Sequence, residues 1–242
     1  MKFTKLTGVA LVAALAFTGV QSASAAPEAS QGLSADDRAQ LTTFLTDGGV
    51  TAETTATLLK KLEDGQMWDS LAGGTVVSTD SSESATAYDT VTTYADGSIS
   101  VTSLEKGVPA ATGAITPFAV SGCTTKNTGT LRTSRNCTAS ERRGVVNMSF
   151  KVGYDQRFSA SDLAYVTGAS LLAPTNASVT TIGGTYSIRN FGRTKTTASA
   201  GSPATARLTV DFQCVGGWCA NTTWMQVNVP INTYTLAYTT HN

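Results

Sequence analysis

Histidine is almost absent from this 242-residue chain, whose single histidine is His241, next to the last position. An imidazole is needed for a Ser-His-Asp or Cys-His nucleophile, for a histidine-based metal centre and for a histidine general base. The sequence therefore gives little support for any of these sites. The G-x-S-x-G, H-E-x-x-H, phosphate-loop and G-x-G-x-x-G motifs are missing as well. We therefore expect no cofactor and no metal, and a non-enzymatic role is favoured.

Charged residues and long apolar runs are also scarce. Charged residues make up 14% of the chain, against the usual ~25%. No stretch beyond the N-terminal region approaches the ~20 apolar residues of a spanning helix, so we expect no transmembrane segment. Hydrophobic residues reach 41%, which is enough to build a core and excludes a disordered chain.

The first 25 residues have the pattern of a cleavable signal peptide. Lys2 and Lys5 form a basic region, residues 9–17 form an apolar run too short to cross a bilayer comfortably, and Ala23-Ser24-Ala25 supplies the small-x-small cleavage pattern. We expect the mature chain to start at Ala26 and the protein to be secreted and extracellular.

Four cysteines, Cys123, Cys137, Cys214 and Cys219, predict two disulfide bonds in an exported chain. Three pairings are possible. Cys123–Cys137 with Cys214–Cys219 closes the shortest loops and is favoured, since a ~15-residue loop stabilises the fold by about 3 kcal/mol in the chain-entropy model. A zinc site is the alternative, but no histidine lies near either pair.

The net charge of zero hides two oppositely charged segments. Residues 26–120 contain 13 acidic and four basic residues, a net charge of −9, and residues 121–242 contain 11 basic and four acidic residues, a net charge of +7. The segments can attract each other, or the basic one can meet an anionic surface. Two solvated faces without a partner are an equal alternative.

The N-terminal half predicts a helical pair followed by a β-hairpin. Leu41, Phe44 and Leu45 form one apolar stripe, and Gly48-Gly49 and Gly65 mark the helix ends. Residues 88–94 and 98–104 alternate around Ala95-Asp96-Gly97, which predicts the hairpin. The chain thus divides into a signal peptide (1–25), an acidic helical pair plus hairpin (26–105), a Gly/Pro-containing linker (106–117) and a disulfide-containing β-sandwich (118–242).

The C-terminal half alternates apolar and polar residues, most clearly over 146–152, 208–213 and 225–232. Pro230 should make the last of these an edge strand or mark a bulge. Gly183-Gly184, between two β-rich runs, predicts a two-residue hairpin. The fold class is mainly β: an antiparallel β-sandwich preceded by a short helical pair and a β-hairpin.

Four residues are candidates for ligand binding. Trp218 and Trp224 can stack on sugar rings, although such rings more often pack against a disulfide or complete a core. Arg142-Arg143 can bind phosphate, although a solvated turn has the same sequence. A few basic residues without an ordered groove do not favour nucleic-acid binding.

Glu141, Asp155, Asp162 and Asp211 are the carboxylates of the predicted sandwich. A pair of carboxylates can hydrolyse glycosides without a histidine, but solvated carboxylates are the default. Calcium binding by loop carboxylates stays open, although nothing matches the twelve-residue calcium loop.

Several short stretches resemble a family of uncharacterised secreted proteins from high-GC Gram-positive bacteria. They are Trp68-Asp69-Ser70, Val77-Ser78-Thr79, Tyr94-Ala95-Asp96-Gly97-Ser98-Ile99-Ser100-Val101, and Ser121-Gly122-Cys123 with Asn136-Cys137. The resemblance implies an extracellular bacterial setting and carries no known activity or site residues.

The sequence therefore favours a secreted, non-enzymatic β-sandwich protein. Its expected partner is an anionic cell-envelope polymer, a glycan or a protein. One alternative is a secreted precursor whose acidic N-terminal pro-region masks the basic C-terminal domain. Another is a carboxylate-based hydrolase. A pore-forming role has no specific mark in the sequence.

Overall fold

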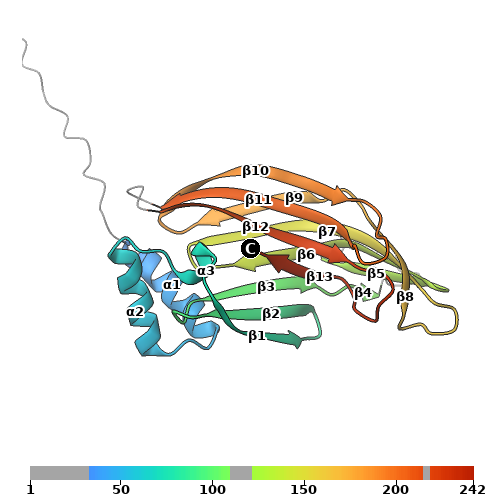
Figure 1. The fold of residues 1–242 in the computed structure, drawn as a ribbon, viewed down its shortest axis with the longest axis horizontal. Coiled ribbons are helices and arrows are strands. Elements are labelled where there is room, and N and C mark those ends of the chain that lie inside the picture. Colours follow the sequence, from blue (N-terminus) through green and yellow to red (C-terminus); the bar gives the residue numbers. More distant parts are fainter. Residues whose placement is uncertain (1–32, 110–121, 215–218) are drawn as a thin grey trace, which may run out of the picture.

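Two antiparallel sheets face each other, and three helices cover one end of them (Figure 1). The computed structural model describes residues 33–109, 122–214 and 219–242. Its mainly β, antiparallel, sandwich-like architecture confirms the predicted fold class. The predicted signal peptide and Trp218 lie outside the described residues.

The larger sheet is organised around β6. One edge of β6 pairs with β7, and the other pairs first with β5 and then with β3. Its strands are β1 (Val76–Glu83), β2 (Ala87–Tyr94), β3 (Ile99–Glu105), β4 (Val108–Pro109), β5 (Thr124–Thr128), β6 (Leu131–Arg142), β7 (Val146–Phe158), β8 (Val166–Leu171) and β9 (Thr175–Thr181). The smaller sheet has the order β10 (Gly184–Lys195), β11 (Ala204–Cys214), β12 (Ala220–Val229) and β13 (Tyr238–His241).

The helices are α1 (Ala35–Asp47), α2 (Ala52–Glu63) and α3 (Asp69–Ala72). Ser34 and Thr51 cap α1 and α2 by accepting backbone N–H bonds from Asp37 and Thr54. The buried indole of Trp68 donates a 2.8 Å hydrogen bond to the carbonyl of Leu58, which fixes α3 against α2. No helix in the described part of the chain is long and apolar enough to cross a membrane.

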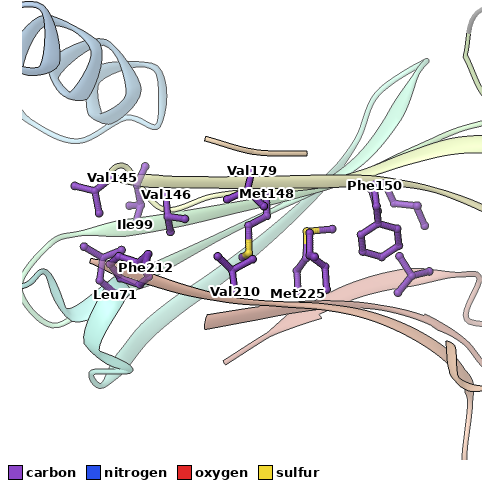
Figure 2. Packing of buried hydrophobic residues seen from close by; sticks show 14 of the residues in the cluster. Leu71, Ile99, Val145, Val146, Met148, Phe150, Val179, Val210, Phe212 and Met225 are labelled. Carbon is purple, nitrogen blue, oxygen red and sulfur yellow. The ribbon is translucent and has the colours of Figure 1, made fainter. Parts of the chain in front are cut away.

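The core fills the space between the two sheets. Figure 2 shows Val146, Met148 and Phe150 of β7 facing Val210 and Met225 of the smaller sheet. Their alternation with polar neighbours matches the sequence pattern, so β7, β11 and β12 form where predicted. Burying each such side chain contributes about 1.5–3 kcal/mol.

One core and one sheet span both sides of the predicted linker. Strand β3 pairs with β6 from Val101 opposite Arg142 to Leu104 opposite Ala139. The buried cluster extends from Leu41 in α1 to Val229 in β12. Residues 110–121 lie outside the described residues. The division at 106–117 therefore does not separate two cores.

The hairpin predicted at Gly183-Gly184 is wrong. Strand β9 pairs with β7 in the larger sheet, and β10 pairs with β11 in the smaller one, so the two glycines carry the chain from one sheet to the other. Gly183 has a φ of +60°, and a Cβ on Gly184 would lie 2.4 Å from the carbonyl of Gln213. Because a sheet-to-sheet corner and a hairpin both demand glycine, the sequence could not tell them apart.

Two other strand predictions also change. Strand β12 pairs with both β11 and β13, so it is not an edge strand, and Pro230 follows its last residue instead of interrupting it. Strand β1 was not predicted. All its residues are exposed, and its sequence has no apolar alternation to reveal it.

Gly144→Ala should destabilise the fold by about 1–3 kcal/mol, because the new methyl would overlap a buried ring. Gly144 has a φ of +78°, and a Cβ there would meet Trp68 Cζ3 at 2.2 Å. Urea unfolding would measure the change. Gly192→Ala is the matched control, because nothing lies within 4 Å of its Cβ position. Equal stabilities for the two variants would contradict this packing.

Candidate functional site

The inward face of the larger sheet changes from apolar to polar at the end away from the helices. Cys137 opposite Val152 is the last apolar pair of β6 and β7 on that face. Two polar rows follow, Thr125–Ser134–Tyr154 and Asn127–Arg132–Gln156, each joining β5, β6 and β7. Inward-facing polar residues break the pattern of a packed core, which is typical of functional sites.

The two rows line a cavity of about 230 Å³. Tyr88 of β2, Lys106 after β3 and Leu236 before β13 form other walls. We call this site the inner cavity. Its lining is mainly polar, with the rings of Tyr88 and Tyr154 among hydroxyl, amide and cationic groups, and such converging polar groups can fix the orientation of a ligand.

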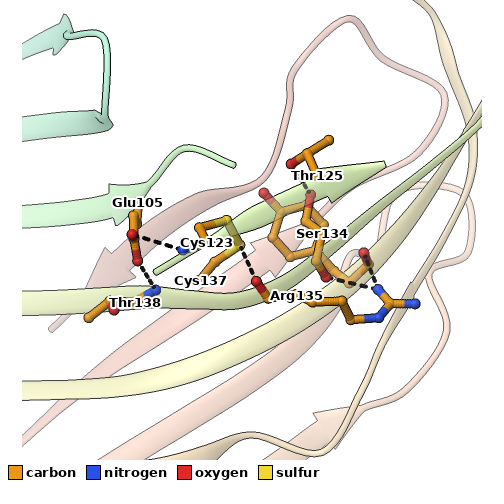
Figure 3. The surroundings of a disulfide bond; sticks show 8 residues. Glu105, Cys123, Thr125, Ser134, Arg135, Cys137 and Thr138 are labelled. Atoms are coloured by element: carbon orange, nitrogen blue, oxygen red, sulfur yellow. Dashed lines mark hydrogen bonds between the residues drawn. A yellow bond between two sulfur atoms is a disulfide. The ribbon is translucent and has the colours of Figure 1, made fainter. Parts of the chain in front are cut away.

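A disulfide fixes the cavity wall to the rest of the sheet. Cys123–Cys137 and Cys214–Cys219 are both bonded, which is the local pairing favoured from the sequence. Figure 3 shows the first disulfide beside Thr125 and Ser134, with the Glu105 carboxylate accepting hydrogen bonds from the backbone N–H groups of Cys123 (2.9 Å) and Thr138 (3.0 Å). Partial burial opposes the charge of Glu105, but these donors outweigh it, so its pKa lies below its ordinary value.

The wall of the cavity contains a hydrogen-bond donor without an acceptor. Gln156 is 1% exposed, and its Nε2 has no hydrogen-bond partner among the described residues. The neighbouring phenol of Tyr154 is 6% exposed, and burial raises its pKa. A buried polar group without a partner costs about 1–3 kcal/mol, so a ligand that supplies an acceptor would recover that energy.

Two cations complete the site. Arg132 donates to Asn127 (3.2 Å) with its guanidinium 4.7 Å from the ring centre of Phe158. The Lys106 ammonium donates to Glu83 (2.6 Å) and lies 5.1 Å from the ring centre of Tyr88. The donors of Gln156, Arg132 and Lys106 suit an acceptor-rich, negatively charged ligand group.

The sequence-predicted ligand residues do not gather in one place. Trp224 lies half-buried on the outer face of the smaller sheet, where the guanidinium of Arg207 covers its ring at 4.1 Å. Arg142 is exposed beside the ring of Phe44, 5.0 Å from its centre. Arg143 is buried and forms an ion pair with Glu141, so its guanidinium is not presented to solvent.

His241 belongs to β13 and lies largely buried against β3 and β6, although a position next to the end of a chain favours fraying. Its Nε2 is 3.1 Å from Ser100 Oγ, and its Nδ1 is 3.6 Å from Glu141 Oε1. The order serine, histidine, carboxylate is that of a catalytic triad. Ser100 and Glu141 are both 0% exposed, however, so a substrate cannot reach the hydroxyl in this conformation. The network holds β13 in place.

Burial shifts the two titratable groups of this network in opposite directions. It raises the pKa of Glu141 to about 7, against the pull of the Arg143 charge. Burial and then the Arg143 charge lower the pKa of His241 to about 4. Glu141 thus contributes stability that is lost as pH rises from 4.5 to 7, and His241 contributes stability that is lost as pH falls from 6.5 to 4. The two dependences largely offset each other.

The candidate carboxylates of a hydrolase each have a separate partner. Asp155 pairs with Arg135 at 2.7 Å, Asp211 with Arg189 at 2.9 Å, and Asp162 accepts from the Tyr234 hydroxyl at 2.9 Å. Glu141 is held in the buried network. The arrangement therefore gives no facing carboxylate pair among these four and lends no support to the hydrolase alternative.

Sequence reasoning missed the inner cavity, but one signal for it exists. The inward positions of β7 run from Val146 at every second residue and reach Tyr154 and Gln156. Continuing the period past Val152 would have placed a glutamine on a buried face. An inward-facing amide at the end of an apolar run is the mark of this site.

His241→Gln should be more destabilising at pH 7 than at pH 4, by about 3 kcal/mol, because it removes the stability that neutral His241 contributes only at the higher pH. Urea unfolding of both proteins at the two pH values would measure this difference. A loss of stability that is the same at pH 4 and pH 7 would contradict a buried, neutral His241.

No family model matches the chain, no curated protein matches it, and no solved structure matches it. The assignment of a role therefore depends on the geometry of the inner cavity.

Proposed function

We propose that this protein is a secreted, non-enzymatic binding protein that holds an anionic glycan or polymer of the cell envelope in its inner cavity. The observation that carries the proposal is the buried Nε2 of Gln156, which has no partner in the described part of the chain and lines the same cavity as the cations Arg132 and Lys106. Carboxylate or phosphate oxygens would accept from all three groups, whereas an apolar ligand would leave the amide unpaired.

The charge distribution supports the same ligand class. Residues 121–242, which supply Arg132 and most of the cavity wall, carry a net charge of +7. A basic surface attracts an anionic polymer over several ångströms, and that attraction weakens with salt. Hydroxyl groups of Thr125 and Ser134 can meet the hydroxyls of a sugar in the same cavity.

The precursor alternative has less support. Strand β3, within the acidic segment, hydrogen-bonds to β6 and buries Leu104 against Ala139. Removing residues 26–105 would strip β1, β2 and β3 from the sheet and expose that edge of β6. An intact chain is therefore the form that we expect to bind.

Arg132→Gln should weaken binding of an anionic polymer at least about tenfold, because one charge-assisted hydrogen bond contributes about 1.5–3 kcal/mol. Calorimetric titration with polygalacturonate and with poly(glycerol phosphate) would measure the change and would separate carboxylate from phosphate recognition. Lys126→Gln is the matched control, because Lys126 is an exposed residue of β5 between the cavity residues Thr125 and Asn127.

Gln156→Leu tests the cavity without changing the charge and should weaken binding as well. Equal losses for Arg132→Gln and Lys126→Gln would indicate attraction to the general surface charge, and no binding to either polymer would overturn the proposal. Thermal unfolding of each variant would confirm that the fold is retained.

Intact mass of the protein recovered from culture medium should show one species that begins near Ala26 and carries two disulfides. Measuring the mass with and without reduction gives both the number of disulfides and the first residue of the chain. A species beginning between Lys106 and Ser121 would favour the secreted precursor instead.

A further inference from the structure

Two loop tips project large apolar side chains into solvent. Tyr234, between β12 and β13, is 64% exposed, and Leu163, between β7 and β8, is also 64% exposed. Such exposure of two large apolar residues on neighbouring loops needs an explanation, because single exposed residues are normal but clusters mark binding surfaces.

The Tyr234 ring is held in a fixed orientation. Its hydroxyl donates to Asp162 Oδ2 at 2.9 Å, and its ring lies edge-on to Tyr165 with centres 5.1 Å apart and planes at 70°. Asp162 is itself fixed, since its Oδ1 accepts from the N–H of Ala164 at 3.0 Å. We call Tyr234, Tyr165, Asp162 and Leu163 the tyrosine platform.

The backbone clamps the two loops of the platform together. The N–H of Val166 donates to the carbonyl of Thr233 at 2.9 Å, and the N–H of Asn232 donates to the carbonyl of Val166 at 2.7 Å. Within the loop between β7 and β8, the N–H of Ser159 donates to the carbonyl of Tyr165 at 2.9 Å. A platform fixed in this way loses little conformational entropy when a ligand binds.

We infer that the tyrosine platform is a second binding site, which stacks the pyranose ring of an uncharged glycan on Tyr234. The face of an aromatic ring is negative, and a sugar ring presents a face of weakly positive C–H groups that fits it. The carboxylate of Asp162 at the edge of the ring can accept from a sugar hydroxyl.

The carboxylate also argues against a lipid membrane as the occupant. Insertion of Tyr234 and Leu163 into a bilayer would carry Asp162 out of water, because its carboxylate accepts a hydrogen bond from the Tyr234 hydroxyl. Moving a carboxylate from water into a bilayer is costly, whereas a sugar offers hydroxyl donors to the carboxylate in place of water. An uncharged glycan is therefore the better fit.

The platform proposal depends on different residues from the cavity proposal. The cavity proposal depends on the charges of Arg132 and Lys106, while the platform depends on an uncharged ring. The segment before β13 nevertheless contributes to both, through Leu236 in the cavity and Tyr234 in the platform. Separate variants can therefore test the two proposals without confusion.

Titration calorimetry of the full chain with cellohexaose and with chitohexaose would test the inference. We expect at least one of these uncharged oligosaccharides to bind and Tyr234→Ala to weaken its binding tenfold or more. Tyr234→Phe keeps the stacking face and loses only the bond to Asp162, so it should bind within about threefold of the wild type. Tyr186→Ala is the matched control, because Tyr186 is an exposed tyrosine of β10 outside the platform.

No binding of either oligosaccharide by the wild type would overturn the inference, as would binding that Tyr234→Ala leaves unchanged. Sedimentation with phosphatidylcholine vesicles that depends on Tyr234 would overturn it in favour of a membrane. Tyr234→Ala should leave binding of polygalacturonate and poly(glycerol phosphate) unchanged, because Tyr234 does not line the inner cavity, so failure of the platform is distinguishable from failure of the cavity.

Discussion

Strand β6 hydrogen-bonds to β7 along one edge and to β5 and then β3 along the other. The last contact joins the N-terminal helices and β1–β3 to the disulfide-bonded half of the chain. The same strand carries Cys137, Glu141 and Arg132, so the disulfide, the buried ion pair and the inner cavity all take their positions from it. Hydrogen bonds of Ser70, Ser100 and Glu105 to the disulfide-bonded half of the chain add to the pairing of β3 with β6.

The oppositely charged segments are held together by this pairing and by the common core. Among the described residues, each ion pair lies within one segment; examples are Lys61 with Asp96, Lys106 with Glu83, and Arg189 with Asp211. Strand hydrogen bonds and apolar burial thus account for the association that charge attraction alone would not provide. The net charge of +7 on residues 121–242 is thus not neutralised by ion pairs to the acidic segment among the described residues.

The sequence predicted the parts of this fold that depend on local pattern. Alternation located β7, β11 and β12, an apolar stripe and terminal glycines located α1 and α2, and loop length indicated the disulfide pairing. It could not predict the bulge in β6 at Arg135 and Asn136, where Asn136 has a φ of +58°. That extra residue shifts the inward positions from Arg132 and Ser134 to Cys137, Ala139 and Glu141. The polar cavity wall and the buried Glu141 therefore share one face although simple alternation would place them on opposite faces.

The sequence also could not predict the burial of His241, since its partner Ser100 lies 141 residues away.

That separation also constrains the order in which the chain can fold. Strands β3 and β6 are synthesised long before β13, so Glu141 and Arg143 have no contact with His241 and Asn242 until the last residues of β13 are made. Contacts between such distant residues form late and slowly, because a long loop must close before they stabilise anything. An incompletely synthesised chain would therefore remain open at this end of the sandwich, where its exposed apolar surface favours recognition by a chaperone or a protease.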